Sequence, residues 1–141
     1  MKVFLDTNVI IDHIFNRQND GFADEITKIF DRCEFGIMQS FASSASFFTM
    51  QYLMRKKYSK TDTAAILENY LQLIEPIGTT KMNLLMAIKS DFRDLEDAFQ
   101  YQTALNEGNI SYFLSGNLKD FRVFQLPQLP VISPADFLKL F

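Results

Sequence analysis

The sequence predicts an α/β fold built on a parallel sheet, and three observations lead to this prediction. Residues 3–5 form a short apolar run typical of a strand that is buried on both faces. Val9, Ile10 and Ile14 follow at once with helical spacing. Strand-like and helix-like segments then alternate along the chain, an order that gives parallel strands joined by right-handed crossovers.

The first half of the chain is expected to contain four helices and a second strand. The helices are predicted at 7 to about 17, 20–32, 42–57 and from 60 or 61 to 73, and the strand at 36–40. Ser59 or Thr61 is a suitable N-cap for the fourth helix.

The second half shows the same alternation. It predicts an extended piece at 75–78, helices at 82–89 and 94–106, a strand at 112–114 and a last strand after Pro130. Residues 107–109 have the composition of a helix C-cap. Ser133 and Pro134 are suited to the N-cap and first position of a closing helix.

Composition indicates one cytoplasmic domain over residues 1–141. The chain is 48% apolar with 15 Phe and no Trp, enough for one well-filled core. Cys33 stands alone, so neither a disulfide framework nor a thiolate zinc cluster is expected, and a small buried side chain is the simpler interpretation. Charges at Lys2 and Asp6 argue against a signal peptide, and no apolar run is long enough to span a membrane.

The net charge of −3 excludes a strong overall attraction to nucleic acid. RNA binding would therefore need a local basic patch or bridging metal ions. The basic cluster Arg55, Lys56 and Lys57, with Lys60 nearby, is either a solvated helix end or a set of contacts to RNA phosphates.

Carboxylates and amides occur at three places that a parallel sheet would bring to one edge. They are Asp6 after the first strand, Asp94, Glu96 and Asp97 at the start of a helix, and Asn117 and Asp120 after the strand that ends at Leu114. Oxygen ligands from separate elements suit Mg²⁺ or Mn²⁺, which keep water ligands and meet substrate phosphates. The sequence therefore predicts metal-assisted hydrolysis of a phosphodiester.

Each of these residues also has a purely structural interpretation. Asp6 could cap the following helix, although Thr7 and Asn8 are suitable caps themselves. Asp94 and Asp97 resemble a capping arrangement, and Glu96 and Asp97 point in different directions on a helix, so at most one is a direct ligand. Asn117 and Asp120 could be turn residues that bond their own backbone. Asp6 and Asp97 are both expected to lie outside the core.

With these motifs the chain resembles the PIN domain family of metal-dependent ribonucleases, which includes toxins of bacterial toxin–antitoxin pairs. The resemblance covers nearly the whole chain and rests on residues 3–12, 95–101 with Ala104, 114–121 and 130–138. It implies a three-layer α/β/α sandwich whose parallel sheet has the order 3-2-1-4-5. That order places the first and fourth strands side by side, where ligands bind in open α/β sheets.

The resemblance also implies roles for individual residues. Asp6, Asp97 and Asp120 would be catalytic, and Asp6, Asp97 and Asn117 would hold Mg²⁺ or Mn²⁺, with Asn8, Ser46, Glu96 and Ser115 around them. Ser115 stands where the family usually has threonine. Ser46 stands where many members carry a glutamate, and losing that charge lowers the expected affinity for a cation.

Three functions compete. The first is a metal-dependent endoribonuclease, as in the toxin of a toxin–antitoxin pair, with RNA as substrate, an antitoxin protein as partner, and a homodimer by family analogy. The second is a degenerate PIN domain that binds RNA or protein without cutting. The third, a phosphatase of the haloacid dehalogenase type, needs a second aspartate where this chain has Asn8, which cannot act as an acid.

Overall fold

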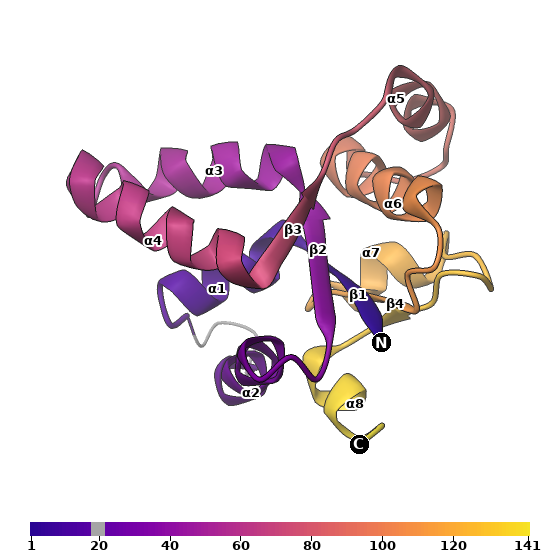
Figure 1. Cartoon of the computed structure of the whole chain (residues 1–141). Helices are drawn as coiled ribbons and strands as arrows, with labels where there is room; N and C mark the ends of the chain where they lie inside the picture. Colours follow the sequence, from indigo (N-terminus) through magenta and orange to yellow (C-terminus); the bar gives the residue numbers. More distant parts are fainter. Residues whose placement is uncertain (18–21) are drawn as a thin grey trace.

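The computed structural model describes residues 1–17 and 22–141, and its centre is one parallel sheet. The five strands are β1 (Lys2–Leu5), β2 (Gln39–Ser43), β3 (Ile74–Ile77), β4 (Tyr112–Leu114) and β5 (Val131–Ile132). Their order is β3-β2-β1-β4-β5, as the family resemblance implied (Figure 1). In register, Val3 pairs with Ser40 of β2 on one side and with Tyr112 of β4 on the other.

Helices follow or separate the strands along the chain. They are α1 (Thr7–Ile14), α2 (Ala23–Glu34), α3 (Ser44–Met54), α4 (Lys60–Leu73), α5 (Lys81–Ile88), α6 (Leu95–Glu107), α7 (Leu118–Arg122) and α8 (Pro134–Leu138). Within the described ranges none of them is long and apolar enough to cross a membrane.

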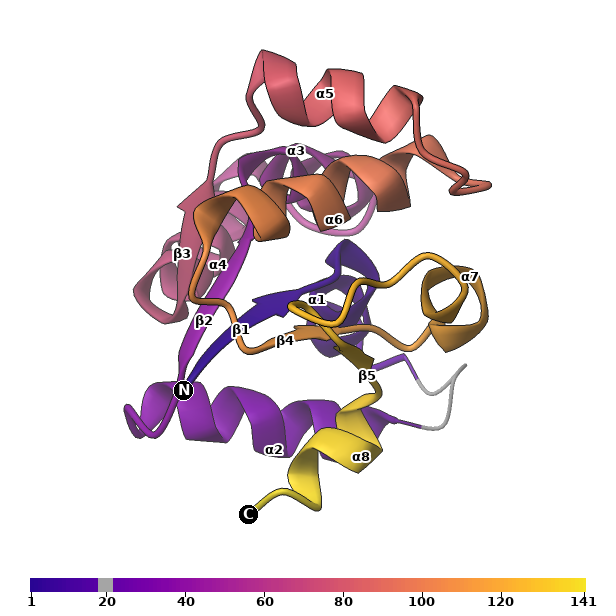
Figure 2. The ribbon, with the colours of Figure 1, turned by 90° about the vertical axis from the view of Figure 1, so that its right-hand side faces the viewer.

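Alternating side chains of the central strand divide the core into two parts. Val3 and Leu5 belong to the cluster filled by α1, α2, α3, α4 and α8, whereas Phe4 faces the cluster filled by α6 and α7. Figure 2 shows α2 and α8 on one side of the sheet and α5 and α6 on the other. The predicted three-layer α/β/α sandwich is therefore confirmed.

The structure differs from the sequence prediction at four places. The third helix, predicted at 42–57, runs only from Ser44 to Met54, because residues 42 and 43 pair with β3 and belong to β2. The first helix ends at Ile14 and not near 17, because Phe15 caps it and Asn16 turns into a left-handed conformation with φ 48°. Residues 36–38 are a turn with Gly36 at φ 69°, and the second strand starts at Gln39 because its pairing with β1 begins there. Residues 118–122 form the unpredicted helix α7, which is too short to show a periodic pattern.

The other elements lie within a few residues of their predicted positions. Ser59 is the N-cap of α4, and Ser133 caps α8 with Pro134 in its first turn. Gly108, at φ 69°, ends α6 as the sequence predicted. The predicted start of the second helix at Asp20 lies outside the described residues.

Candidate active site

Asp6 lies at the carboxyl end of β1, at the edge where the strand order reverses. Its backbone N–H donates to the carbonyl of Leu114 in β4 over 3.0 Å. Asp6 is also the N-cap of α1, since its carboxylate accepts the backbone N–H of Asn8 over 3.4 Å. Capping by Asp6 is the structural interpretation that the sequence left open, and Thr7 and Asn8, although suitable caps, belong to the helix itself.

The carboxylate of Asp6 is buried and held by two side chains. Ser115 Oγ donates to Oδ2 over 2.7 Å, and Gln100 Nε2 donates to Oδ1 over 3.3 Å. Asp6 is only 1% exposed, so the expectation that it lies outside the core is wrong. Burial raises its pKa, and the hydrogen bond from Ser115 acts in the opposite direction.

A buried polar chain connects Asp6 to the helix after β2. Gln100 Oε1 accepts the backbone N–H of Thr7 over 2.9 Å and the Thr7 hydroxyl over 3.0 Å. The Thr7 hydroxyl also lies 2.7 Å from Ser46 Oγ. Sequence reasoning missed Gln100, although it follows Asp97 by three residues and therefore shares its face of α6.

Asp97 lies in the first turn of α6, where the charges of Asp6 and of other acids act on it. Asp94 caps that helix, accepting the backbone N–H of Asp97 over 3.0 Å, as predicted. Burial, followed by the charges of Asp6, Asp94, Asp120 and Glu96, raises the pKa of Asp97 to about 7. Asp97 is thus within electrostatic reach of Asp6 and of Asp120, which come from two other parts of the sequence.

Asn117 and Asp120 form a pair after β4. Asn117 Nδ2 donates to Asp120 Oδ2 over 2.8 Å, and the backbone N–H of Asn117 donates to Ser115 Oγ over 3.0 Å. Asn117 begins α7 without making a side-chain cap bond. Its side chain therefore orients a carboxylate in this structure, which differs from the alternative of a turn residue bonded to its own backbone.

The remaining predicted site residues are Glu96, Ser46, Asn8 and the basic cluster, and they differ in how they relate to Asp6 and Asp97. Glu96 and Ser46 line a cavity of about 180 Å³ together with Thr7 and Gln100. Asn8 is exposed and contributes its backbone N–H to Asp6. The basic cluster of residues 55–57 follows the C-terminal end of α3, whereas Ser46 lies in its first turn.

The donor set fits a hard divalent cation. Carboxylate and amide oxygens are the ligands that such cations prefer. The pKa of Asp97 is raised first by burial and then by neighbouring negative charges, and a cation would relieve the repulsion between these charges. The ion pair found in the described part of the chain, Lys139 with Asp136, does not involve these acids. Over the same residues, no three acidic, histidine or cysteine side chains are already gathered as a metal site.

This fold and this site define a class: three-layer α/β proteins with a buried aspartate where the two central parallel strands, β1 and β4, end. The PIN domain profile matches residues 2–119, and the chain belongs to the PIN domain family. It is 28% identical over 143 residues to ribonuclease VapC1 of Aquifex aeolicus (strain VF5), covering 96% of this chain and 92% of that protein.

Solved structures show the same fold at lower identity. VapBC2 from Rickettsia felis, bound to a DNA fragment from its promoter, is 19% identical with a TM-score of 0.64, covering 94% of this chain and 98% of that one. A toxin–antitoxin complex from Klebsiella pneumoniae is 17% identical with a TM-score of 0.65, covering 94% and 97%. DNA-bound VapBC from Salmonella typhimurium is 17% identical with a TM-score of 0.68, covering 95% and 98%.

Proposed function

We propose that this PIN domain is an endoribonuclease that hydrolyses RNA phosphodiester bonds with Mg²⁺ or Mn²⁺. The observation that carries the proposal is the placement of the half-buried Asp97 near the charges of Asp6 and Asp120, with Asp6 at the shared end of β1 and β4. The relationship to ribonuclease VapC1 supports the same activity. Family membership also favours this function over the phosphatase alternative.

In this proposal Asp6, Asp97 and Asn117 hold the ion. A bound divalent cation would lower the pKa of a water molecule and neutralise charge on the scissile phosphate. Asp120, oriented by the amide of Asn117, is placed to orient or deprotonate the attacking water. Ser115 and Gln100 fix the Asp6 carboxylate through its two oxygens, and Glu96 adds negative charge at the cavity.

The alternative is a PIN domain that binds RNA or protein without cutting. Ser46 favours it, because this side chain stands where many relatives carry a glutamate and brings no charge. The Ser46 hydroxyl forms a hydrogen bond with the Thr7 hydroxyl and none with Asp6. The side chain of α6 that donates to Asp6 is Gln100.

Metal binding and cleavage measured together separate the two functions. Calorimetry with Mn²⁺ should show binding by the wild-type chain that Asp6→Asn abolishes, and cleavage of single-stranded RNA should disappear in the same variant. Asp24→Asn, an exposed acid on α2, is the matched control and should retain both. Absence of any metal binding that depends on Asp6 would reject the enzyme.

We also propose a protein antitoxin as partner, since the three structural neighbours are a toxin–antitoxin complex and two VapBC assemblies. An acidic site of this kind suits a cationic segment of such a partner.

A homodimer is proposed as well, supported by α5, where Met82, Met86 and Ile88 are more than half exposed. Light scattering on the purified chain should give twice the monomer mass, and Met82→Glu with Ile88→Glu should restore the monomer.

A further inference from the structure

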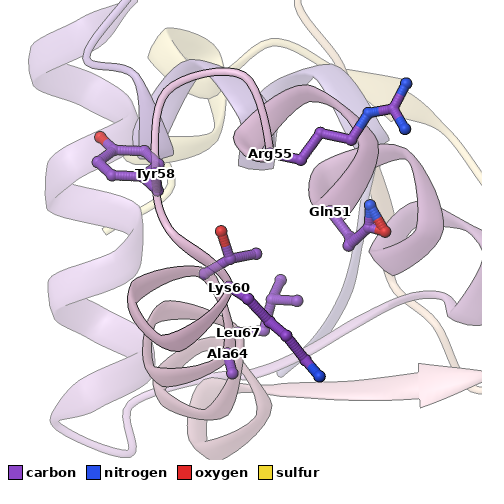
Figure 3. Close-up of a pocket in the computed structure, with 7 residues that line it drawn as sticks. Gln51, Arg55, Tyr58, Lys60, Ala64 and Leu67 are labelled. Carbon is purple, nitrogen blue, oxygen red and sulfur yellow. The ribbon is translucent and has the colours of Figure 1, made fainter.

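A second cavity lies in the hairpin formed by α3 and α4, far from the acidic site. It measures about 450 Å³ and is lined by Gln51, Arg55, Tyr58, Lys60, Thr63, Ala64 and Leu67 (Figure 3). Helix α3 begins at Ser44, near the Ser46 end of the site, and its 11 residues span about 16 Å. The groove at its other end is therefore separated from Asp6 by more than the reach of one side chain.

The lining has an apolar floor and a polar rim. On α4, Lys60, Thr63, Ala64 and Leu67 share one face through i, i+3, i+4 and i+7 spacing. Arg55 follows α3 and Lys60 begins α4, and Figure 3 shows their side chains leaving the two helices with the charged ends pointing apart. A ligand in it would meet hydrocarbon below and positive charge at the edge.

Thr63 places an unused hydrogen-bonding group at this floor. Its side chain is 5% exposed. Among the described residues, its Oγ1 is the buried side-chain polar atom that has no hydrogen-bond partner. Thr63 Oγ1 has almost no accessible surface, so a ligand reaches it only when the side chain turns toward the groove. A buried hydroxyl without a partner costs free energy that such a contact would recover.

The cations at the rim are also available. In the part of the chain that the structure describes, neither Arg55 nor Lys60 pairs with a carboxylate. Lys56 and Lys57 lie beside them, and aromatic rings are interleaved with this cluster. The Arg55 guanidinium lies 4.2 Å from the centre of the Tyr52 ring, and Lys57 Nζ lies 5.7 Å from that of Tyr58. Cations mixed with aromatic rings are typical of single-stranded nucleic acid binding.

We propose that this groove binds one nucleotide of single-stranded RNA, as an anchoring site remote from the carboxylates. Its phosphate contacts Arg55 and Lys60, and its base lies on Leu67 and Tyr58 with its edge toward the Thr63 hydroxyl. The proposal rests on RNA being the substrate of the proposed function. An acidic peptide would also meet the cations, but an apolar side chain inserted on the floor would leave the Thr63 hydroxyl unpaired.

Binding of RNA to the wild-type chain in EDTA tests the site without any cleavage. The probe is a fluorescein-labelled decamer of oligouridine or oligoadenosine, followed by anisotropy at several salt concentrations. Arg55→Ala with Lys60→Ala should weaken binding about tenfold, and the slope of log K against log salt should fall by about 0.7 for each phosphate that is no longer neutralised. Thr63→Val, which keeps the shape, should weaken binding about threefold with no change of slope.

Lys28→Ala with Lys89→Ala is the matched control, because it removes the same charge from exposed positions on α2 and after α5. If this control weakens binding as much as the groove variant, only net charge matters and the proposal is overturned. It is also overturned if Thr63→Val binds as the wild type does. Displacement of the decamer by a Glu- and Leu-rich peptide that binds more tightly than RNA would assign the groove to a protein partner instead.

Cleavage kinetics distinguish the failure of this site from failure of the proposed function. A dinucleotide is too short to reach both sites, so the groove variant should cleave it like the wild type while its KM for the decamer rises and kcat stays constant. An unchanged KM for the decamer would reject the groove as an anchor. A chain that binds the decamer through the groove and cuts nothing would reject the nuclease and leave the groove site standing.

Discussion

At the scale of single residues, Gln100 connects the parts of the acidic site. One amide can donate and accept at the same time, and here it donates to Asp6 and accepts from the backbone and hydroxyl of Thr7. No other type of side chain of this length has both functions without charge. Gln100 is therefore a positioning residue for Asp6.

Replacing Gln100 should damage stability and activity in distinguishable ways. Gln100→Met removes both kinds of hydrogen bond at similar volume and leaves the Thr7 N–H buried and unpaired, so urea unfolding should show a loss of about 1–3 kcal/mol. Gln100→Glu adds a carboxylate beside Asp6, and because like charges raise pKa values, the pH at which cleavage reaches half its maximum should move upward.

Gln102→Met, on a different face of α6, is the control for both measurements. Its effect on stability should stay within about 0.5 kcal/mol, as for a substitution away from the core. An equal loss in the Gln102 and Gln100 variants would show that the amide of Gln100 has no special role.

Asp97 gives a pH dependence with a defined sign. Its pKa is raised from 3.8 to about 7 in the folded chain, so folding favours the protonated form. The free energy of unfolding is therefore highest, as far as Asp97 is concerned, below pH 3.8, where this group is protonated in both states. This stability is lost as the pH rises through about 7, because the folded chain then has to hold a buried charge. Without metal, Asp97→Asn should stabilise the chain at pH 8 by about 1 kcal/mol after allowance for solvent screening, and should have little effect at pH 4.

The same group should make metal affinity depend on pH. A proton must leave Asp97 before it can bind a cation, so the affinity for Mn²⁺ should rise about tenfold between pH 6 and pH 8 and level off above that. Calorimetry in buffers of different ionisation enthalpy measures both the affinity and the proton release. An affinity that is constant over this range would remove Asp97 from the ligands.

At the scale of the elements, the first turn of α6 has two opposing functions. Asp94 stabilises the helix by capping Asp97 N–H, yet its charge also raises the pKa of Asp97. A good cap and an acidic site are therefore built from the same few residues. The same holds for α1, where Asp6 is both the N-cap and a proposed ligand.

Two substitutions at Asp94 separate these effects. Asp94→Ala should cost about 1 kcal/mol at pH 4, where Asp97 is protonated and only the cap is lost. At pH 8 the cost should be smaller because a like charge beside Asp97 disappears. Asp94→Asn keeps a capping group without the charge, so unfolding at pH 8 should show it to be at least as stable as the wild type. Equal costs for Asp94→Ala at both pH values would contradict the coupling.

At the scale of the whole molecule, the acidic edge joins parts of the chain that are about a hundred residues apart. Ser115 and Gln100 both reach Asp6, and their hydrogen bonds connect β1, α6 and the segment after β4. An ion bound there would tie these elements together in the folded state only. Metal should therefore act on global stability.

Thermal unfolding with and without Mn²⁺ measures this linkage. A ligand that binds only the folded state stabilises it by about 2.7 kcal/mol at a concentration of about 100 times Kd. The midpoint temperature of unfolding, Tm, should rise with added Mn²⁺ and return to its starting value on adding EDTA. In Asp6→Asn, Mn²⁺ should leave Tm unchanged. A response that persists in Asp6→Asn would place the ion elsewhere.

The sequence by itself determined the elements whose signals are contiguous. The apolar run before Asp6, the helix that follows it, the strand at 112–114 and the Ser133–Pro134 helix start are where periodicity and caps place them. The strand order followed from the family resemblance and is confirmed. The acids Asp6, Asp97 and Asp120 were proposed as site residues from the sequence, because each follows a strand or opens a helix, and their role stays a prediction.

Tertiary structure alone decided the rest, because hydrogen-bond partners and burial depend on residues distant in sequence. Pairing with β1 set the start of β2 at Gln39. Packing buried Asp6, and it brought Gln100 to Thr7 across 93 positions. Neighbouring residues encode a helix or a strand, but only the folded chain determines which side chain satisfies a buried carboxylate or leaves the Thr63 hydroxyl without a partner.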